Sequence, residues 1–272
     1  MEKQKDLTII KLGGSLLTDK STPYQMKSEK FRDIAREIHE TLEKVIIIHG
    51  VGSLGHPPVK KYGLYKGYTG PENLLNLAKT QSIVFELRIE FVRALQEEGI
   101  NAMIFLPSSQ VIAENMRIKE FFLEPVKKFL EIGMVPVLGG DMVIDERMGF
   151  SVCSGDTLAV YLADKLGAKR LIFASDVDGI YTNDPKKDPE ARHIPEINLN
   201  AVDLIAGITG SNFIDVTKGM AGKIEAIERY RGIIEKGTEV VFLSMLNYGN
   251  LKAYLSGNSE AKFTKITVKR EK

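Results

Sequence analysis

The sequence predicts an α/β fold in which helices cover both faces of one largely parallel central sheet, an αβα sandwich. Short apolar runs alternate along the chain with longer segments whose apolar residues recur at helical spacing. Strands separated by helices need crossover connections, which favour parallel pairing. The 272 residues contain no internal repeat, low-complexity tract or linker rich in Gly, Ser or Pro, so we expect a single domain over 1–272.

Each element is predicted from its own local pattern. The apolar run at 7–12, closed by Gly13 and Gly14, predicts a buried strand, and Ser28 is suited to cap the helix that follows. Gly99 is suited to end a long helix at 73–98, because glycine adopts the left-handed conformation common after a helix. The remaining strands are expected at 45–48, 103–106, 134–138, 170–174 and 239–243, and the remaining helices at 120–131, 157–166 and 223–236.

The composition limits the classes of function. Lysine and arginine number 37 against 36 acidic residues, so the formal charge is +1, which argues against a nucleic-acid-binding protein. Hydrophobic residues make up 43% of the chain, which indicates a globular rather than a disordered protein. A single cysteine, Cys153, excludes an internal disulfide and a cysteine metal cage. Since no signal-peptide core or membrane-length apolar run is found, we expect a cytoplasmic protein without a membrane partner.

Glycine-rich loops directly follow the predicted strands, at the edge of a parallel sheet where ligands bind. Lys11 lies near the end of the first strand, and Gly13, Gly14 and Ser15 follow it. The glycines let backbone N–H groups approach an anion closely, and the lysine supplies positive charge. A tight turn beside a surface lysine explains this loop alone equally well.

The second loop, residues 49–56, contains three glycines that match G-x-G-x-x-G (Gly50, Gly52 and Gly55). Pro57 and Pro58 follow where a dinucleotide-binding fold needs its helix, so that function is not favoured. We interpret the segment as an anion-binding nest, with His56 at its end to donate to a phosphate oxygen. The alternative is a structural or merely solvated histidine.

Three later segments carry acids, glycines or lysine in comparable positions. Gly139, Gly140, Asp141 and Asp145 precede Ser154-Gly155-Asp156, which opens a helix; a helix N-terminus binds anions, although Asp156 alone is also explained as a helix cap. The turn with Asp176, Asp178 and Tyr181 lacks the later ligands of a calcium loop and fits one that orients a nucleotide, a lysine or a magnesium ion. Lys223 begins a predicted helix, where a bound phosphate would offset its unfavourable interaction with the helix dipole.

Together these loops resemble the amino-acid kinase superfamily. The matching segments lie in the same order over nearly the whole chain, at 11–15, 18–20, 49–57, 140–141, 154–156, 176–181 and 215–223. The other common nucleotide motifs, G-x-x-x-x-G-K-[ST] and H-R-D with D-F-G, are absent from the sequence. Residues 52–56 are most similar to the isopentenyl phosphate kinase family, whose phosphate-binding histidine matches His56. Val51 and Lys218 depart from the family pattern, each standing in place of a glycine.

The resemblance implies an ATP-dependent phosphotransferase that converts isopentenyl phosphate to isopentenyl diphosphate, with Mg²⁺ held mostly by phosphates and water. It also implies a homodimer, an acceptor-binding lobe at about 1–165 and a nucleotide-binding lobe at about 166–272. The implied catalytic residues are Lys11, Lys20, His56 and Lys223, with Asp145 and Asp156 orienting the lysines. The acceptor is assigned to Val51, Gly52, Gly55, His56 and Gly155, and ATP to Lys11, Gly13, Gly14, Ser15, Gly52, Asp176, Asp178, Tyr181, Gly219 and Lys223.

Two other functions stay open. Fosfomycin-resistance kinases share the arrangement of glycines followed by histidine, so a different small phosphate or phosphonate is an alternative acceptor. A non-catalytic nucleotide- or anion-binding protein on the same fold is the second alternative. The three lysines Lys11, Lys20 and Lys223 argue against it, because binding alone does not need three converging charges.

Overall fold

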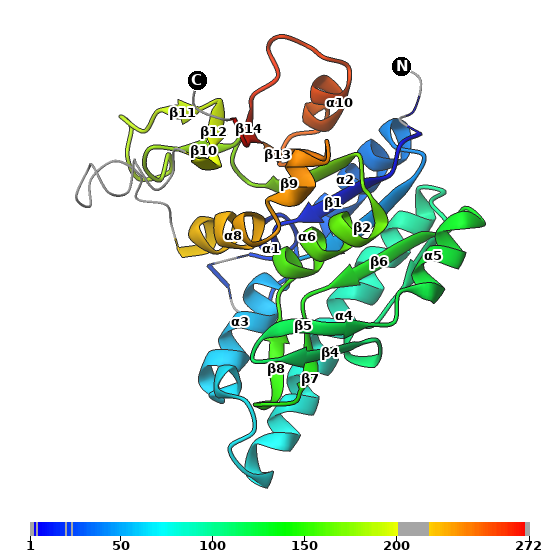
Figure 1. Cartoon of the computed structure of the whole chain (residues 1–272), viewed down its shortest axis with the longest axis vertical. Coiled ribbons are helices and arrows are strands. Elements are labelled where there is room, and N and C mark those ends of the chain that lie inside the picture. The colour runs from blue at the N-terminus through cyan, green and yellow to red at the C-terminus, as the bar shows by residue number, and fades with distance from the viewer. Residues whose placement is uncertain (1–2, 4, 20, 23, 201–217, 270–272) are drawn as a thin grey trace.

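The computed structural model describes residues 3, 5–19, 21–22, 24–200 and 218–269 (Figure 1). Neighbouring strands of its central sheet run parallel except β13 and β14, which pair antiparallel. The expected αβα fold with a largely parallel sheet is confirmed. Within the described residues the sheet has eight strands, in the order β12 (Glu196–Asn198), β14 (Phe263–Thr267), β13 (Glu239–Ser244), β9 (Arg170–Ser175), β1 (Thr8–Leu12), β2 (Val45–His49), β6 (Val135–Gly139) and β3 (Ala102–Ile104).

Helices cover both faces of this sheet because successive strand residues point to opposite sides. Ile9 of β1 belongs to the core on one face, together with α5 (Glu124–Glu131), α6 (Gly155–Leu166), α8 (Lys218–Arg229) and α9 (Gly232–Glu235). Its neighbour Ile10 belongs to the core on the other face, with α1 (Gly14–Leu17), α2 (Ser28–Thr41), α3 (Gly52–Lys61), α4 (Leu74–Glu97) and α10 (Asn250–Leu255). β1 is therefore buried on both faces, as its continuous apolar run predicts.

A second, smaller sheet lies below the central one in Figure 1, next to α3 and α4. Its strands are β5 (Arg117–Phe121), β4 (Val111–Glu114), β7 (Asp141–Asp145) and β8 (Gly149–Cys153). A short hairpin pairs β10 (Ile180–Tyr181) with β11 (His193–Ile194), and single turns of 3-10 helix occur at η1 (Leu64–Lys66), η2 (Pro71–Asn73) and η3 (Pro107–Ser109). These short strands were not predicted from the sequence, because most of them lack a long apolar run.

Three expected elements need correction. The helix expected at 120–131 begins only at Glu124, because 120 and 121 end strand β5. The helix expected at 223–236 begins at Lys218 and is interrupted after Arg229, before α9. The third is the segment from 52 onward, which is helix α3 and not an open loop, although it contains Pro57 and Pro58.

The two prolines fit inside α3 because a proline removes one backbone donor, and the carbonyl it leaves unbonded can find another partner. Pro57 lacks the N–H that would bond the Ser53 carbonyl, and this carbonyl accepts the Tyr24 N–H at 3.4 Å instead. Helix α3 is thereby joined to the segment that follows β1. Among the helices of the described residues, none is long and apolar enough to cross a bilayer.

Candidate active site

A cleft of about 680 Å³ opens at the carboxyl ends of β1, β2, β6 and β9, where an open α/β sheet binds its ligands. Its walls bring together most of the residues that the sequence predicted for the site. They include Lys11, Gly13, Gly14, Ser15, Val51, Gly52, Gly55, His56, Gly155, Asp156, Asp176, Tyr181 and Lys223.

The first two glycine loops pack directly against each other on one side of the cleft. A Cβ atom added to Gly14 would lie 2.5 Å from the Cα of Gly52, and one added to Gly50 would lie 2.6 Å from the backbone nitrogen of Gly14. Gly52 also has a positive φ of +46°, a conformation that favours glycine. Only residues without a side chain allow this approach, so the glycines serve the contact between loops as well as access to an anion.

The Thr18 hydroxyl joins these two loops. It donates a hydrogen bond to the Gly14 carbonyl at 2.8 Å and accepts one from the Ser53 N–H at 3.0 Å. Ser53 lies in the first turn of α3, whose N–H groups have no partner within the helix. Thr18 therefore caps α3 from a different segment of the chain, and its role was not predicted.

Two lysines and one aspartate form the charged centre of the cleft. Asp156 Oδ1 lies 2.7 Å from Lys11 Nζ, and Asp156 Oδ2 lies 3.4 Å from Lys223 Nζ. The α6 helix is capped by Ser154, which accepts the Thr157 N–H at 3.0 Å, so the Asp156 carboxylate is available to the lysines. The alternative in which Asp156 serves only as the cap is wrong.

The charged groups in this centre shift one another's pKa values. Burial alone would raise the pKa of Asp156, but the positive charges of Lys11 and Lys223 outweigh burial and lower that pKa. Burial, followed by repulsion from Lys11, lowers the pKa of Lys223, while Asp156 acts in the opposite direction. Taken by themselves, Lys11, Lys223 and Asp156 are two cations and one anion, so this centre carries a local positive charge that favours an anionic ligand.

His56 lies on α3 and is exposed to the same cleft. Desolvation by the surrounding walls, followed by the positive charge of Lys11, lowers the pKa of His56, and Asp156 partly opposes this. A neutral imidazole still carries one N–H donor for a phosphate oxygen. A bound phosphate would also raise the pKa of His56, because a nearby anion favours the charged form.

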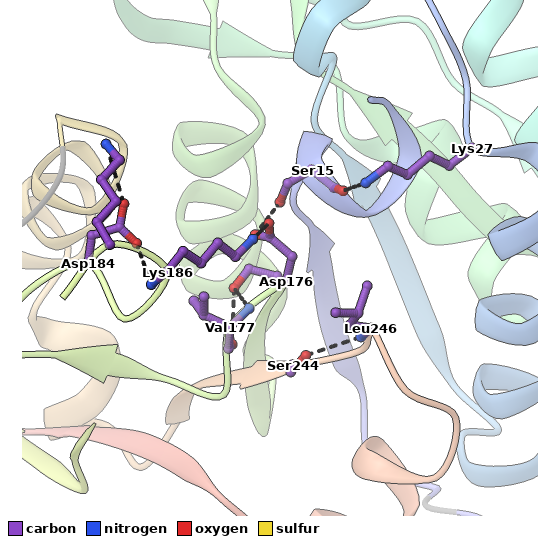
Figure 2. A network of polar contacts seen from close by, with 10 residues as sticks. Ser15, Lys27, Asp176, Val177, Asp184, Lys186, Ser244 and Leu246 are labelled. Carbon is purple, nitrogen blue, oxygen red and sulfur yellow. Dashed lines mark hydrogen bonds and ion pairs between the residues drawn. The ribbon is translucent and has the colours of Figure 1, made fainter. Parts of the chain in front are cut away.

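A second polar network lines the other part of the cleft (Figure 2). The Ser15 hydroxyl donates to Asp176 Oδ1 at 2.6 Å, and Asp176 Oδ2 forms an ion pair with Lys186. The Lys27 ammonium donates to the Ser15 carbonyl at 3.0 Å. Figure 2 shows the side chains of Ser15 and Lys186 pointing toward Asp176 from separate segments, so this carboxylate ties α1 to the loop after β10.

Buried polar groups lie directly beneath the loops. Arg88 of α4 is only 1% exposed, and its Nε donates to His49 Nε2 at 3.0 Å. One of its terminal nitrogens, Nη2, donates to the Gly140 carbonyl at 3.3 Å, and the other lies 3.8 Å from Asp141 Oδ2. Arg88 was not predicted as a site residue, because nothing near position 88 in the sequence distinguishes it from a surface arginine.

The remaining predicted residues have different outcomes. Asp178 accepts a hydrogen bond from the Tyr181 hydroxyl at 3.5 Å beside the cleft and is not on its wall. Gly219 lies in the first turn of α8, and Lys20 lies outside the described residues.

Asp145 does not orient the lysines, and that expectation is wrong. Its carboxylate ends strand β7 in the smaller sheet, where it accepts backbone N–H groups of Asn115, Met116, Arg147 and Met148. Burial would raise the pKa of Asp145, but these hydrogen bonds hold it below its usual range. Asp145 therefore organises two turns of the smaller sheet, between β4 and β5 and between β7 and β8.

The comparisons with known proteins agree with this geometry. The isopentenyl phosphate kinase of Methanothermobacter thermautotrophicus is 36% identical over 97% of this chain and all of its own length. The enzyme of the same name from Methanocaldococcus jannaschii is 36% identical over 86% of this chain and 92% of its own. A crystal structure of an isopentenyl phosphate kinase, 34% identical, superposes with a TM-score of 0.81 over 96% of this chain and all of the other. The model of the amino acid kinase family matches residues 6–239, and the chain therefore belongs to that family.

Proposed function

We propose that this chain transfers the γ-phosphoryl group of ATP to isopentenyl phosphate, producing isopentenyl diphosphate and ADP for isoprenoid synthesis by an alternative mevalonate route. The observation that carries the proposal is the convergence of Lys11, Lys223 and His56 on one cleft that continues between apolar side chains. The apolar part is lined by Val59, Val84, Met142 and Val152, and it suits a short hydrocarbon tail attached to a phosphate. The names of the relatives support the same acceptor.

The chemistry requires little beyond positioning and charge neutralisation. The attacking phosphate oxygen is already ionised near neutral pH, so no general base has to remove a proton. The barrier comes largely from bringing two anions together, and positive groups placed around the transferring phosphoryl group lower it. We assign Lys11 and Lys223 to the transferring and leaving phosphates, and Lys20 to the transition state or to closure of its loop.

The acceptor phosphate is assigned to His56 and to backbone N–H groups near Val51, Gly52, Gly55 and Gly155. Gly155 begins α6, where N–H groups and the helix dipole favour an anion. Asp156 holds the two lysines in place between the acceptor and the donor. The chain's contribution is thus a rigid set of cations and N–H donors between two phosphate groups.

The nucleotide is assigned to the loop of Gly13, Gly14 and Ser15, with Asp176, Tyr181 and Gly219 on its border. Within the part of the chain that the structure describes, no three His, Cys, Asp or Glu side chains are grouped to hold a metal ion. As the family resemblance implies, we expect Mg²⁺ to be held mostly by ATP phosphates and water, and we assign no protein ligand or reaction step to it.

We also propose that the chain acts as a cytoplasmic homodimer, with acceptor binding by about 1–165 and nucleotide binding by about 166–272. Sedimentation velocity on the purified protein tests the dimer, and a monomer at micromolar concentration contradicts it.

A panel of acceptors tests the proposed reaction. ADP release is measured with isopentenyl phosphate, dimethylallyl phosphate, fosfomycin, UMP and glutamate, each with ATP and Mg²⁺. We expect the highest kcat/KM with isopentenyl phosphate and a diphosphate product by ³¹P NMR. A higher kcat/KM with fosfomycin or UMP would show that this compound, and not isopentenyl phosphate, is the acceptor. ATP binding without ADP release in the presence of any acceptor would indicate a non-catalytic protein.

A further inference from the structure

Arg88, His49 and Asp141 are buried polar side chains that the proposed reaction leaves without a role. His49 is fully buried, and Arg88 is the largest of the fully buried side chains in the described residues. Removing a guanidinium from water is costly unless its donors are all well paired. Its hydrogen-bond partners are His49, the last residue of β2 and the neighbour of Gly50, and Gly140, which lies between β6 and β7; Gly50 and Gly140 both line the cleft.

The hydrogen bonds define which nitrogen of His49 carries the proton. Arginine can only donate, so His49 Nε2 must accept from Arg88 Nε. The other ring nitrogen, Nδ1, lies 3.2 Å from the Gly50 carbonyl oxygen and must donate to it. Burial, followed by repulsion from Arg88, lowers the pKa of His49 to about 3, so this neutral form persists at physiological pH.

This hydrogen bond turns the Gly50 carbonyl toward the protein interior. Because a trans peptide is planar, the N–H of the following residue points in the opposite direction. That residue is Val51, which lines the cleft and precedes the first residue of α3. The opposite orientation of this peptide would present a carbonyl oxygen to a bound phosphate and repel it.

The same arginine connects the loop to the apolar wall. Thr80, Val84 and Arg88 lie four residues apart on α4, and therefore on one face of the helix. Thr80 and Val84 line the cleft, while Arg88 bonds to the chain beneath it. The position of the apolar wall relative to the phosphate loop is thus set partly by Arg88.

We propose that Arg88 is a positioning residue for the acceptor phosphate: through His49 it holds the Gly50–Val51 peptide with its N–H toward the cleft. That the acceptor is isopentenyl phosphate rests on the proposed function, whereas the binding of an anion beside the Val51 N–H rests on the geometry alone. This positioning role predicts that the acceptor, and not ATP, senses the loss of Arg88.

The test uses pairs of variants with matched shape in the full-length protein. His49→Asn keeps a donor at the position of Nδ1, whereas His49→Leu has the same branching without a donor. Arg88→Met removes the guanidinium, and Arg93→Met is its control, because Arg93 lies on the same helix with an exposed side chain paired to Glu90. KM values for isopentenyl phosphate and ATP are measured for each variant, together with affinity for inorganic phosphate by calorimetry.

We expect Arg88→Met and His49→Leu each to raise the acceptor KM about tenfold, the loss of one hydrogen bond to a charged group, with little change in the KM for ATP. His49→Asn keeps a donor for the Gly50 carbonyl but loses the acceptor for Arg88, so it should raise the acceptor KM less than His49→Leu does. Arg93→Met should stay close to the wild type. Adding Arg88→Met to His49→Leu should raise the KM no further, because the arginine acts through the histidine.

Equal changes in both KM values, or multiplied effects in the double variant, would overturn the positioning role. If Arg88→Met does not fold, the comparison of His49→Leu with His49→Asn decides, and equal acceptor KM values in that pair contradict the proposal. A wild type that does not phosphorylate isopentenyl phosphate overturns the proposed function instead. In that case the affinities for inorganic phosphate test the role of Arg88: Arg88→Met and His49→Leu should bind phosphate more weakly than the wild type, and Arg93→Met should not.

Discussion

The ammonium group of Lys11 lies 2.7 Å from the carboxylate of Asp156, although one residue belongs to a central strand and the other to the first turn of a helix. The strand holds Lys11 firmly, since β1 pairs with β2 on one side and β9 on the other. The helix N-terminus favours the negative charge of Asp156. Lys223 shares the same carboxylate, so one acid holds two cations in a small space.

Replacing Asp156 by Asn should lower kcat by about 100-fold, because misplaced lysines no longer align with the transferring phosphoryl group. The asparagine keeps the shape of the side chain but removes the charge that pairs with Lys11 and Lys223, so we also expect a lower Tm. Steady-state ADP release measures the effect. Asp164→Asn is the control, since Asp164 is also on α6 and pairs with Lys236 at 3.0 Å, outside the cleft walls. A similar loss of kcat in both variants would contradict the assignment.

Replacing His56 by Ala should raise the KM for the acceptor about 10- to 100-fold, the value of one charge-assisted hydrogen bond. The KM for ATP should stay nearly constant, because the histidine is assigned to the acceptor phosphate alone. The same coupled assay measures both constants. His39→Ala, on helix α2, serves as the control. An unchanged acceptor KM in His56→Ala would remove His56 from the acceptor site.

Gly52→Ala should abolish most of the activity and destabilise the fold. An added Cβ would meet the Thr18 hydroxyl and the Gly14 carbonyl, at a residue with positive φ. Gly63→Ala separates the two causes, because Gly63 has a positive φ of +65° but no atom within 4 Å of an added Cβ. Urea unfolding should show about 1 kcal/mol lost for Gly63→Ala and about 1–3 kcal/mol more for Gly52→Ala. Equal losses would mean that backbone strain alone matters.

His49 should make the fold less stable in acid. Burial, followed by repulsion from Arg88, lowers the pKa of His49 from 6.5 to about 3 in the folded protein. Below the ordinary value the unfolded chain therefore takes up a proton that the folded chain does not, and the free energy of unfolding falls as pH falls. The contribution approaches about 1.4 kcal/mol per pH unit. Urea unfolding between about pH 5 and pH 7 measures the slope, which should be shallower in His49→Asn. Parallel slopes would show that His49 is not responsible.

Lys20→Ala should lower kcat with little effect on the affinity for ATP, since we assign Lys20 to the transition state or to loop closure. Lys20 lies outside the described residues, so the prediction depends on its match to the family pattern. Calorimetry measures ATP binding, and ADP release measures turnover. Lys30→Ala, on helix α2, is the control. Normal turnover in Lys20→Ala would show that the charge is not needed.

Local signals explain why much of this site was predictable. Lys11 lies near the end of an apolar run that two glycines close, and Asp156 follows a helix-capping Ser154. Residues with such signals meet because strand ends and helix starts share one edge of a parallel sheet. Nothing local indicates that Arg88 bonds to His49, because the pairing depends on how α4 packs beneath β2.

Helix α3 and Asp145 show where the sequence-based predictions failed. Proline normally disfavours a helix interior, but the Ser53 carbonyl that Pro57 leaves unbonded is satisfied by the N–H of Tyr24, a partner 29 positions earlier in the chain (53 − 24 = 29). In the sequence Asp145 follows the glycines of the candidate site, but in the structure its carboxylate accepts hydrogen bonds from the turn between β4 and β5. Both errors arise from contacts between distant segments.

The order of strands in the central sheet determines what happens when the chain is split into two fragments. Strand β1 lies between β2 from the first half of the chain and β9 from the second, and each pairing joins five residues of β1 in register. A cut in the chain between α6 and β9 would leave either fragment with an open, apolar sheet edge. We therefore expect such fragments to be insoluble alone and to regain a working cleft only when expressed together, which makes this connection a suitable place for a split reporter.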